Sequence, residues 1–175
     1  LVRPISYDSQ AALFTVQRNA EDTVIQFVSL DDFSQINRIA IPRPAESVYI
    51  VARQGAPMIM LNGLDGSCLL QAADSATPAV DRGQCRYVPG RDVNGDNIGD
   101  AIRLGPGGLA LTDLNITEDI ELQADHDADA AGYLGEQLVT ATTDGQTLRV
   151  NYHDQVGLNL LVDEQTNVAS GAVFE

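Results

Sequence analysis

Oxygen-bearing side chains recur at every second residue in the stretch DVNGDNIGD. Asp92, Asn94 and Asp96 alternate with other residues, and Asp100 follows four positions after the last of them. A hard cation such as Ca²⁺ is held by six to eight oxygen atoms at about 2.4 Å. Carboxylates placed this close repel one another, and a divalent cation reverses the sign of that interaction. The spacing therefore predicts a calcium site with side-chain oxygens from these four residues.

The remaining residues of this stretch suit a loop that wraps around an ion. Gly95 and Gly99 give the backbone freedom to turn, and the backbone carbonyl of Ile98 is the natural further ligand. Because the loop itself supplies these ligands and leaves no evident open position, we expect the ion to have a structural role. The alternative is a solvated acidic turn that binds no metal.

The longer stretch DVNGDNIGDAIRLG resembles the calcium loop of FG-GAP/VCBS repeats, the blades known from integrin α chains. In that family the pattern is Asp-x-Asn/Asp-x-Asp-Gly-x-x-Asp, followed by an apolar strand. One position departs from it, because Asn97 stands where the family usually has Gly. Asn tolerates a left-handed backbone better than most residues, so the loop is retained. The resemblance implies a calcium-stabilised, propeller-like β-module of the adhesion type.

A second acidic stretch, DHDADAAGYLGE, has the ligand spacing of an EF-hand-like loop. Asp125, Asp127, Asp129 and Glu136 occupy its positions 1, 3, 5 and 12. The position that needs a sharp turn holds Ala130 instead of Gly. This stretch is a second, weaker candidate for a cation site, and a flexible acidic loop without an ion is the alternative.

No group of residues in the sequence has the pattern of a catalytic site. His153 and Asp154 form a lone pair at the end of an expected strand, without a Ser or Cys in a recognisable nucleophile turn. We expect His153 to be an exposed strand residue. Among 25 acidic residues some pair falls at the separation needed for glycoside hydrolysis by chance. A secreted hydrolase acting on polysaccharide is therefore kept only as an alternative, and no catalytic or cofactor-binding residue is predicted.

Period-two alternation of apolar residues predicts β-strands along most of the chain. In QTLRVNYHD, for example, Leu148, Val150 and Tyr152 lie on one face and the polar residues on the other. Asp144-Gly145 precedes this run and predicts a hairpin with a type I′ turn. No stretch has helical periodicity, so the sequence predicts an all-β protein.

Four groups of strands, each about forty residues long, follow one another in the sequence, as the blades of a β-propeller do. They cover residues 10–45, 46–88, 89–124 and 133–175. The expected architecture is a single all-β domain, 1–175, of antiparallel sheets of short strands, or part of a larger propeller. A two-sheet β-sandwich has the same strand spacing and is the alternative.

The two cysteines, Cys68 and Cys85, predict one disulfide and an oxidising compartment. Closing a loop of this length contributes roughly 3 kcal/mol in the chain-entropy description. A pair of reduced, buried thiols is the alternative. No apolar run approaches the ~20 residues of a membrane-spanning helix, so membrane insertion is not expected. These features predict a secreted, cell-surface or periplasmic protein.

The formal net charge is −15, with 25 acidic residues against ten basic ones. A surface this acidic repels nucleic acid and anionic lipids, so neither is an expected partner. The charge either attracts cations or keeps the protein soluble in salty water. We expect the function to be recognition of a protein or carbohydrate ligand. A structural or assembly role in an envelope or virion is a further alternative.

Overall fold

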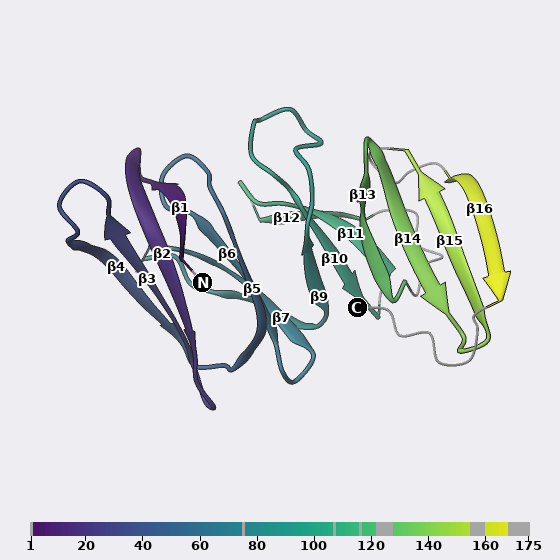
Figure 1. Ribbon diagram of the computed structural model, residues 1–175, viewed down its shortest axis with the longest axis horizontal. Coiled ribbons are helices and arrows are strands. Elements are labelled where there is room, and N and C mark those ends of the chain that lie inside the picture. Colours follow the sequence, from purple (N-terminus) through teal and green to yellow (C-terminus); the bar gives the residue numbers. More distant parts are fainter. Residues whose placement is uncertain are drawn as a thin grey trace. The chain divides into compact units, whose positions relative to one another are not determined.

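The computed structural model describes residues 2–74, 76–106, 108–115, 117–121, 128–154 and 160–167, and Figure 1 shows the order of its strands. All regular elements among these residues are β-strands, which form four antiparallel sheets of four strands each. The chain divides into two compact units, Leu1–Tyr87 and Val88–Glu175, which are described separately below. The described residues include no helix with the length and hydrophobicity of a membrane-spanning segment.

Two sheets make up the first unit. The strands of the first sheet are β1 (Val2–Tyr7), β2 (Gln10–Arg18), β3 (Thr23–Ser29) and β4 (Gln35–Ile41). Those of the second sheet are β5 (Ala45–Val51), β6 (Met58–Gly63), β7 (Ser67–Ala72) and β8 (Val80–Gln84).

The second unit also contains two sheets. The strands of the third sheet are β9 (Arg86–Pro89), which spans the boundary after Tyr87, β10 (Ala101–Gly105), β11 (Gly108–Asp113) and β12 (Glu118–Glu121). Those of the fourth sheet are β13 (Ala130–Leu134), β14 (Gln137–Thr143), β15 (Thr147–His153) and β16 (Leu160–Asn167).

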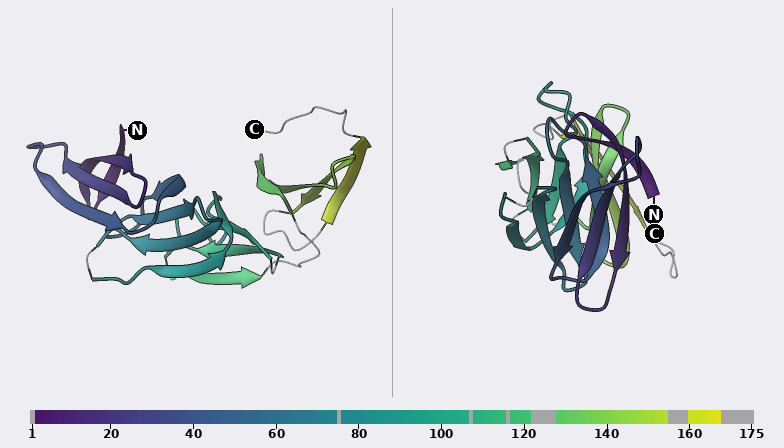
Figure 2. Two further views of the ribbon diagram at one scale, coloured as in Figure 1. Left: turned by 90° about the horizontal axis from the view of Figure 1, so that it is seen from below. Right: turned by 90° about the vertical axis from the view of Figure 1, so that its left-hand side faces the viewer.

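Within every sheet the strands lie side by side in the order in which they follow in the chain. Each sheet is thus a four-stranded meander, and its strands are twisted relative to one another, as Figure 2 shows. The prediction of short-stranded, blade-like antiparallel sheets is confirmed. In the alternative of a sandwich the same strands would form two sheets, whereas the described residues form four.

The first sheet begins earlier than the sequence analysis expects, at Val2 instead of residue 10. Strand β1 pairs with β2 through a two-residue turn, Asp8-Ser9. Both turn residues have positive φ, 46° and 67°, which is the backbone of a type I′ turn. Because this turn contains no Gly, its sequence did not mark the hairpin.

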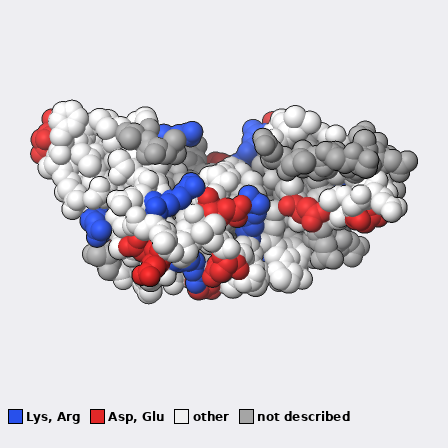
Figure 3. All heavy atoms as spheres, turned by 60° about the horizontal axis from the view of Figure 1, so that its bottom comes forward, with Lys and Arg blue, Asp and Glu red and all other residues white. Residues whose placement is uncertain are grey.

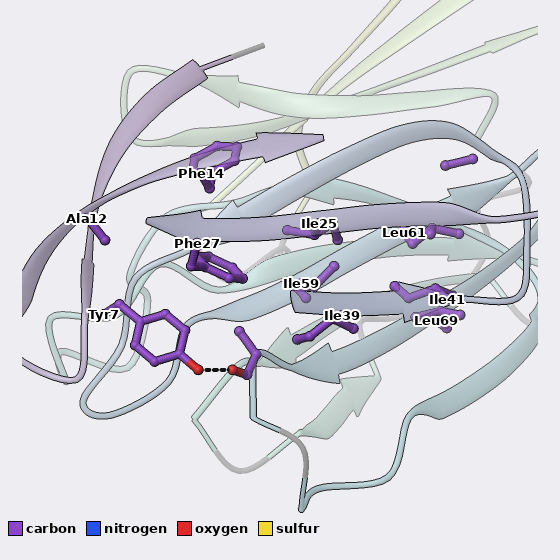
Figure 4. Packing of buried hydrophobic residues seen from close by; sticks show 12 residues of the cluster. Tyr7, Ala12, Phe14, Ile25, Phe27, Ile39, Ile41, Ile59, Leu61 and Leu69 are labelled. Carbon is purple, nitrogen blue, oxygen red and sulfur yellow. Dashed lines mark hydrogen bonds between the residues drawn. The ribbon is translucent and has the colours of Figure 1, made fainter. Parts of the chain in front are cut away.

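A continuous apolar cluster joins the two sheets of the first unit (Figure 4). Phe27 and Ile25 of β3 and Ile59 of β6 are fully buried in it. The ring of Tyr7 packs on that of Phe27 with the centroids 5.0 Å apart. The remaining buried members are Ala12, Phe14, Ile39, Ile41, Ala45, Leu61, Leu69 and Ala73.

Polar contacts tie the two sheets together at the margin of this cluster. The hydroxyl of Tyr7, on β1, donates a hydrogen bond to the carbonyl oxygen of Ala73, directly after β7, as the dashed line in Figure 4 marks. Nδ2 of Asn37, on β4, donates to the same carbonyl at 2.9 Å and to the Tyr7 hydroxyl at 3.0 Å. The Tyr7 hydroxyl, the Asn37 amide and the Ala73 carbonyl therefore supply hydrogen-bond partners for one another.

Cys68 and Cys85 form a disulfide, as the sequence predicts, with their Cα atoms 5.2 Å apart. Cys68 lies on β7, and Cys85 lies between β8 and β9. Both are buried, and the N–H of Cys85 donates to the carbonyl of Gly66 at 3.0 Å. The bridge therefore holds the end of β8 against β7, next to the boundary between the units.

The β3–β4 connection exposes an aromatic side chain on an ordered turn. Phe33 is 74% exposed and has a φ of 57°. Its N–H donates to the carbonyl of Ser29 at 3.1 Å, and Oδ1 of Asp32 accepts from the N–H of Ser34 at 3.0 Å. A bulky residue seldom adopts positive φ, so these bonds hold Phe33 in a strained conformation.

The second unit has a core of its own between the third and fourth sheets. Its fully or almost fully buried members are Ile102, Leu104, Leu109, Leu111 and Leu138. Tyr133 and Ala131 of β13 pack against this cluster, so the fourth sheet covers one face of the third.

The side chain of His153 is buried, at 3% exposure, where the sequence analysis expects an exposed strand residue. His153 pairs with the fully buried Leu138, and Asn151 pairs with the buried Thr140. These four residues share the inner face of the sheet, whereas Leu148, Val150 and Tyr152 are only half-buried. The expectation was wrong because it assumed that the apolar residues of β15 face the core, whereas the polar face of this strand is the buried one. Nε2 of His153 lies 3.2 Å from the hydroxyl of Thr140.

The hairpin predicted at Asp144-Gly145 is present between β14 and β15. Gly145 has positive φ, 88°, and Asp144 does not, so the turn is not of type I′. Instead Oδ1 of Asp144 accepts from the N–H groups of Gln146 and Thr147, at 2.9 and 2.7 Å. These bonds hold the pKa of Asp144 below its usual value.

Candidate metal centre

The loop between β9 and β10 contains all five residues predicted as calcium ligands. Two backbone hydrogen bonds close its base: the N–H of Gly90 donates to the carbonyl of Asp100 at 2.8 Å, and the N–H of Asp100 donates to the carbonyl of Arg91 at 3.0 Å. A Cβ atom at Gly90 would lie 2.7 Å from the carbonyl oxygen of Asp100. The close approach that shuts the loop therefore requires glycine here.

Side-chain oxygens of the loop accept hydrogen bonds from its own backbone. Oδ1 and Oδ2 of Asp92 accept from the N–H groups of Gly95 and Asn97 at 2.7 and 2.8 Å. Oδ1 of Asn94 accepts from the N–H of Asp96 at 3.0 Å. Each of these oxygens has a second lone pair that remains able to contact a cation.

The end of the loop is built in the same way. Oδ1 of Asp96 accepts from the N–H of Ile98 at 2.8 Å. The side chain of Ile98 is buried and anchors the loop to the body of the unit. Gly95 and Asn97 have φ values of 82° and 65°, so Asn97 takes the left-handed conformation for which the family pattern has Gly.

Asp100 is the most buried carboxylate of the loop, with 2% of the residue exposed. Its Oδ2 accepts from the N–H of Val93 at 2.9 Å, whereas its Oδ1 is buried and has no hydrogen-bond partner. The pKa of Asp100 is raised to about 6, mainly by burial and in addition by the negative charges of Asp113, Asp96 and Asp92. The site therefore has a buried carboxylate oxygen that lacks a positive partner.

The carboxylates are near enough to repel one another, yet they are not gathered around one point. Within the described ranges, no group of three or more His, Cys, Asp or Glu residues is placed so as to hold a metal ion. The loop offers carboxylate and amide oxygens, which are the ligands that a hard divalent cation requires. The unpartnered oxygen of Asp100 is one of them.

Asp113 is a residue of the site that the sequence analysis did not identify. It ends β11, and its Oδ2 accepts from Nδ2 of Asn94 at 2.9 Å. The register of the β10–β11 hairpin, in which Ala101 pairs with Thr112, places Asp113 beside Asp100. The glycine-rich stretch between these strands indicates a hairpin, but it does not by itself give the register that places Asp113 beside Asp100.

The loop also contacts the fourth sheet within the same unit. A guanidinium N–H of Arg91 donates to the carbonyl of Gly135, in the turn between β13 and β14. Next to it, Leu134 is 64% exposed. The hydroxyl of Tyr133 has a pKa raised to about 12, first by burial and then by the charge of Asp100. The loop of the candidate site therefore lies next to the end of β13, where Leu134 is exposed.

Of the four residues of the second candidate site, the structure describes Asp129 and Glu136, which lie at opposite ends of β13. Asp125 and Asp127 lie outside the described residues. Asp129 precedes β13, and its Oδ2 accepts from the N–H of Thr143 at 2.7 Å. Glu136 lies in the turn at the far end of that strand. A fully extended strand separates Asp129 from Glu136, where an EF-hand-like loop would bend between them.

No protein-family model matches the sequence. No curated protein matches it either. Two solved structures have a similar fold: the CNH domain of AfRom2, with a TM-score of 0.54 and 7% identity, and the WD40 domain of SCAP from fission yeast, with a TM-score of 0.50 and 9% identity. The alignments cover 95% and 96% of this chain, and 55% and 52% of the other two.

These similarities, together with the four consecutive meanders, define an all-β fold of the propeller-like class. The chain spans about half the length of the two domains it matches. At such low identity the likeness shows the fold alone.

Proposed function

We propose that the protein is an extracellular, calcium-stabilised β-module that recognises a protein partner. The observation that carries the calcium part is the buried, unpartnered Oδ1 of Asp100, within a loop of further acidic oxygens. The resemblance of this loop to FG-GAP/VCBS calcium loops supports the same conclusion.

The ion would be held by the side chains of Asp92, Asn94, Asp96 and Asp100, with the carbonyl of Ile98. When bound, it supplies the positive charge that offsets the repulsion among the carboxylates and the burial of Asp100. A ligand that binds only the folded state stabilises it by about 2.7 kcal/mol at 100 times its Kd. Calcium would therefore stabilise the loop base and the strands that continue from it, β9 and β10.

The disulfide supports an extracellular or periplasmic location, because such bridges persist in oxidising compartments. Calcium-binding modules of these compartments typically have weak sites, with Kd values of about 10⁻⁴–10⁻³ M. A site of that affinity is filled only where calcium is abundant. The disulfide and the proposed ion therefore agree on the compartment.

The recognition part is supported by the fold and by the surface of the second unit. Domains with the propeller-like fold present loops on rigid sheets, which suits binding of a protein partner. The second unit has sixteen acidic residues and three arginines, and so holds most of the net charge of −15. On the face shown in Figure 3, acidic and basic side chains occur in small separate groups.

The partner surface that fits the second unit is basic with an apolar contact. Leu134 is exposed beside the candidate metal centre. A bound divalent cation would neutralise only two of the negative charges, so the unit would keep a net negative charge. Lys or Arg side chains around an apolar pocket would match both features. We therefore propose a protein with such a surface, and carbohydrate recognition is the other outcome.

Thermal unfolding with 2 mM calcium chloride, compared with unfolding in EDTA, tests the calcium part. With a Kd of about 10⁻⁴–10⁻³ M, 2 mM calcium is expected to stabilise the protein by about 0.6–1.8 kcal/mol, which corresponds to a rise in Tm of roughly 1–7 °C in a chain of this size. The Asp92→Ala variant is expected to lose this response. An unchanged wild-type Tm would contradict calcium binding.

A matched control separates loss of the ion from loss of loop hydrogen bonds. Asp144 accepts two backbone N–H groups, as Asp92 does, but lies in the β14–β15 turn. The Asp144→Ala variant is therefore expected to be somewhat less stable and to keep the calcium response. Equal loss of the response in both variants would contradict the proposed ligand role of Asp92.

Selection of displayed random peptides on the immobilised protein tests the recognition part. Peptides with Lys or Arg next to an apolar residue are expected to be enriched when calcium is present, and the Leu134→Ser variant is expected to retain them poorly. Enrichment of acidic peptides would contradict the proposed partner. Retention of defined polysaccharides, with no basic peptides selected, would indicate a carbohydrate ligand instead.

A further inference from the structure

The contact between Asn94 and Asp113 joins the candidate metal centre to a strand outside its loop. Asn94 lies in the loop between β9 and β10, and Asp113 ends β11, nineteen residues later. Nδ2 of Asn94 lies 2.9 Å from Oδ2 of Asp113. The other oxygen, Oδ1 of Asp113, accepts from the N–H of Asn115 at 2.7 Å, so the carboxylate is held from two sides.

This contact fixes which end of the Asn94 side chain faces the loop. An ionised carboxylate accepts hydrogen bonds and donates none, so Asp113 selects the NH₂ end of the amide. Oδ1 of Asn94 must then face the opposite way, where it accepts from the N–H of Asp96 at 3.0 Å. Rotation of the amide by half a turn would place Oδ1 against the carboxylate of Asp113, which is repulsive.

The same geometry explains why an amide is present at this position. A carboxylate in place of Asn94 would face Asp113 directly, in a loop where three other acidic residues already repel one another. The loop pattern accepts either Asn or Asp at this position, and the neighbouring strand favours Asn here. The preference therefore comes from a residue that lies outside the motif.

We propose that Asp113 is a positioning residue for the metal centre, which directs the carbonyl oxygen of Asn94 toward the bound cation. The inference rests on the proposed calcium function and adds a residue to it. Partners that orient a metal ligand are typically worth about 10- to 100-fold in metal affinity. In this arrangement the β10–β11 hairpin controls the affinity of a loop that precedes it.

Calcium titration by calorimetry, on the wild type and on Asp113→Ala, tests the inference. Removal of Asp113 is expected to weaken calcium binding about 10-fold, because the amide of Asn94 is no longer oriented. Asp144→Ala removes an equal charge from the same unit, away from the loop, and is expected to change the affinity less than threefold. Equal affinities for these two variants would overturn the inference.

A second measurement reports the orientation directly and does not depend on calcium. In an ¹⁵N–¹H spectrum, the side-chain amide protons of Asn94 are expected to be shifted by the Asp113 carboxylate in the wild type, in EDTA as well as in calcium. The shift is expected to be lost in Asp113→Ala and kept in Asp144→Ala. An Asn94 signal that is the same in all three proteins would overturn the positioning role.

Exchange of the two side chains completes the test. In the variant Asn94→Asp combined with Asp113→Asn, donor and acceptor are reversed and the contact is restored. If the effects of the two single changes on calcium affinity were additive, their sum would give the affinity of this double variant. The measured affinity is expected to be closer to that of the wild type than this sum. Additive effects would overturn the inference. No calcium binding by the wild type would instead remove the proposed function, which distinguishes the two failures.

Discussion

Oδ2 of Asp100 lies 2.9 Å from the backbone nitrogen of Val93 and accepts its hydrogen bond, whereas the second oxygen of the same carboxylate is buried and has no partner. The single hydrogen bond does not offset the cost of burying the charge, and the pKa of Asp100 is raised to about 6. The site is therefore satisfied either by a proton on Asp100 or by a cation beside it.

In the absence of calcium, we expect the protein to become less stable as the pH rises from about 4 to about 6. The folded state holds a proton on Asp100 up to a pKa of about 6, whereas the unfolded chain releases it near 3.9. Proton binding by the folded state therefore favours folding below pH 4, and this contribution is lost above pH 6. Denaturant unfolding in EDTA at several pH values measures it.

The Asp100→Asn variant isolates this contribution. An amide imitates the protonated carboxyl, so in EDTA the variant is expected to be more stable than the wild type at pH 7 and about equally stable at pH 4. Each pKa unit corresponds to about 1.4 kcal/mol, which sets the scale of the difference. The variant is also expected to lose its calcium response. If the variant were less stable than the wild type in EDTA at pH 7, the negative charge of Asp100 would have to be compensated by another group of the protein.

The residues of the candidate site could be proposed from the sequence, because they lie within nine residues and their spacing is typical of loops that bind a hard cation. The sequence could not show that Asp100 is buried or that Asp113 contacts Asn94. Both depend on the register of β10 against β11, which is a contact between separate segments. Local patterns carry little information on such pairings.

Reduction of the Cys68–Cys85 disulfide is expected to destabilise the first unit by about 3 kcal/mol. The bridge closes a loop of moderate length, and both cysteines are buried, so their replacement also loses packing. Denaturant unfolding with and without dithiothreitol measures the effect in the wild type. The variant Cys68→Ala with Cys85→Ala is the control, because its stability should not respond to dithiothreitol. A wild type insensitive to the reductant would contradict the prediction.

Replacement of Tyr7 by Phe is expected to destabilise the protein by about 1 kcal/mol. The ring and its contact with Phe27 are kept, but the hydroxyl that bonds Ala73 and Asn37 is lost. The half-buried Tyr49 of β5 supplies a comparison, and Tyr49→Phe is expected to change the stability by less than about 0.5 kcal/mol. Denaturant midpoints of the two variants decide the matter, and equal midpoints would speak against a role for the Tyr7 hydroxyl.

Replacement of Phe33 by Asn is expected to stabilise the protein by roughly 0.5–1 kcal/mol. Phe33 has a φ of 57° and an exposed ring, so the change relieves backbone strain and loses little packing. Leu30→Asn, in the same turn but without positive φ, is expected to give no gain. A less stable Phe33→Asn variant would mean that the aromatic ring contributes packing that outweighs the strain.

The strand positions were predicted well where a continuously apolar run coincides with burial, as in β3 and β6. Prediction failed where the inner face is polar: His153 and Asn151 are buried because they pair with Leu138 and Thr140, which no alternation within β15 reveals. It also missed β1, since Asp8-Ser9 forms a tight turn without glycine. In each case the deciding contact lies on another strand.

The consecutive order of strands has a consequence for synthesis on the ribosome. All four strands of the first sheet are available once Ile41 has emerged, and hairpins form in about 1–10 μs. The apolar face of that sheet is covered by residues of β5, β6 and β7, and the last of these strands follows a few seconds later at about 5–20 residues per second. During this interval a nascent chain would expose Phe27 and Ile25, and a chaperone that shields apolar surface would have its main opportunity to bind.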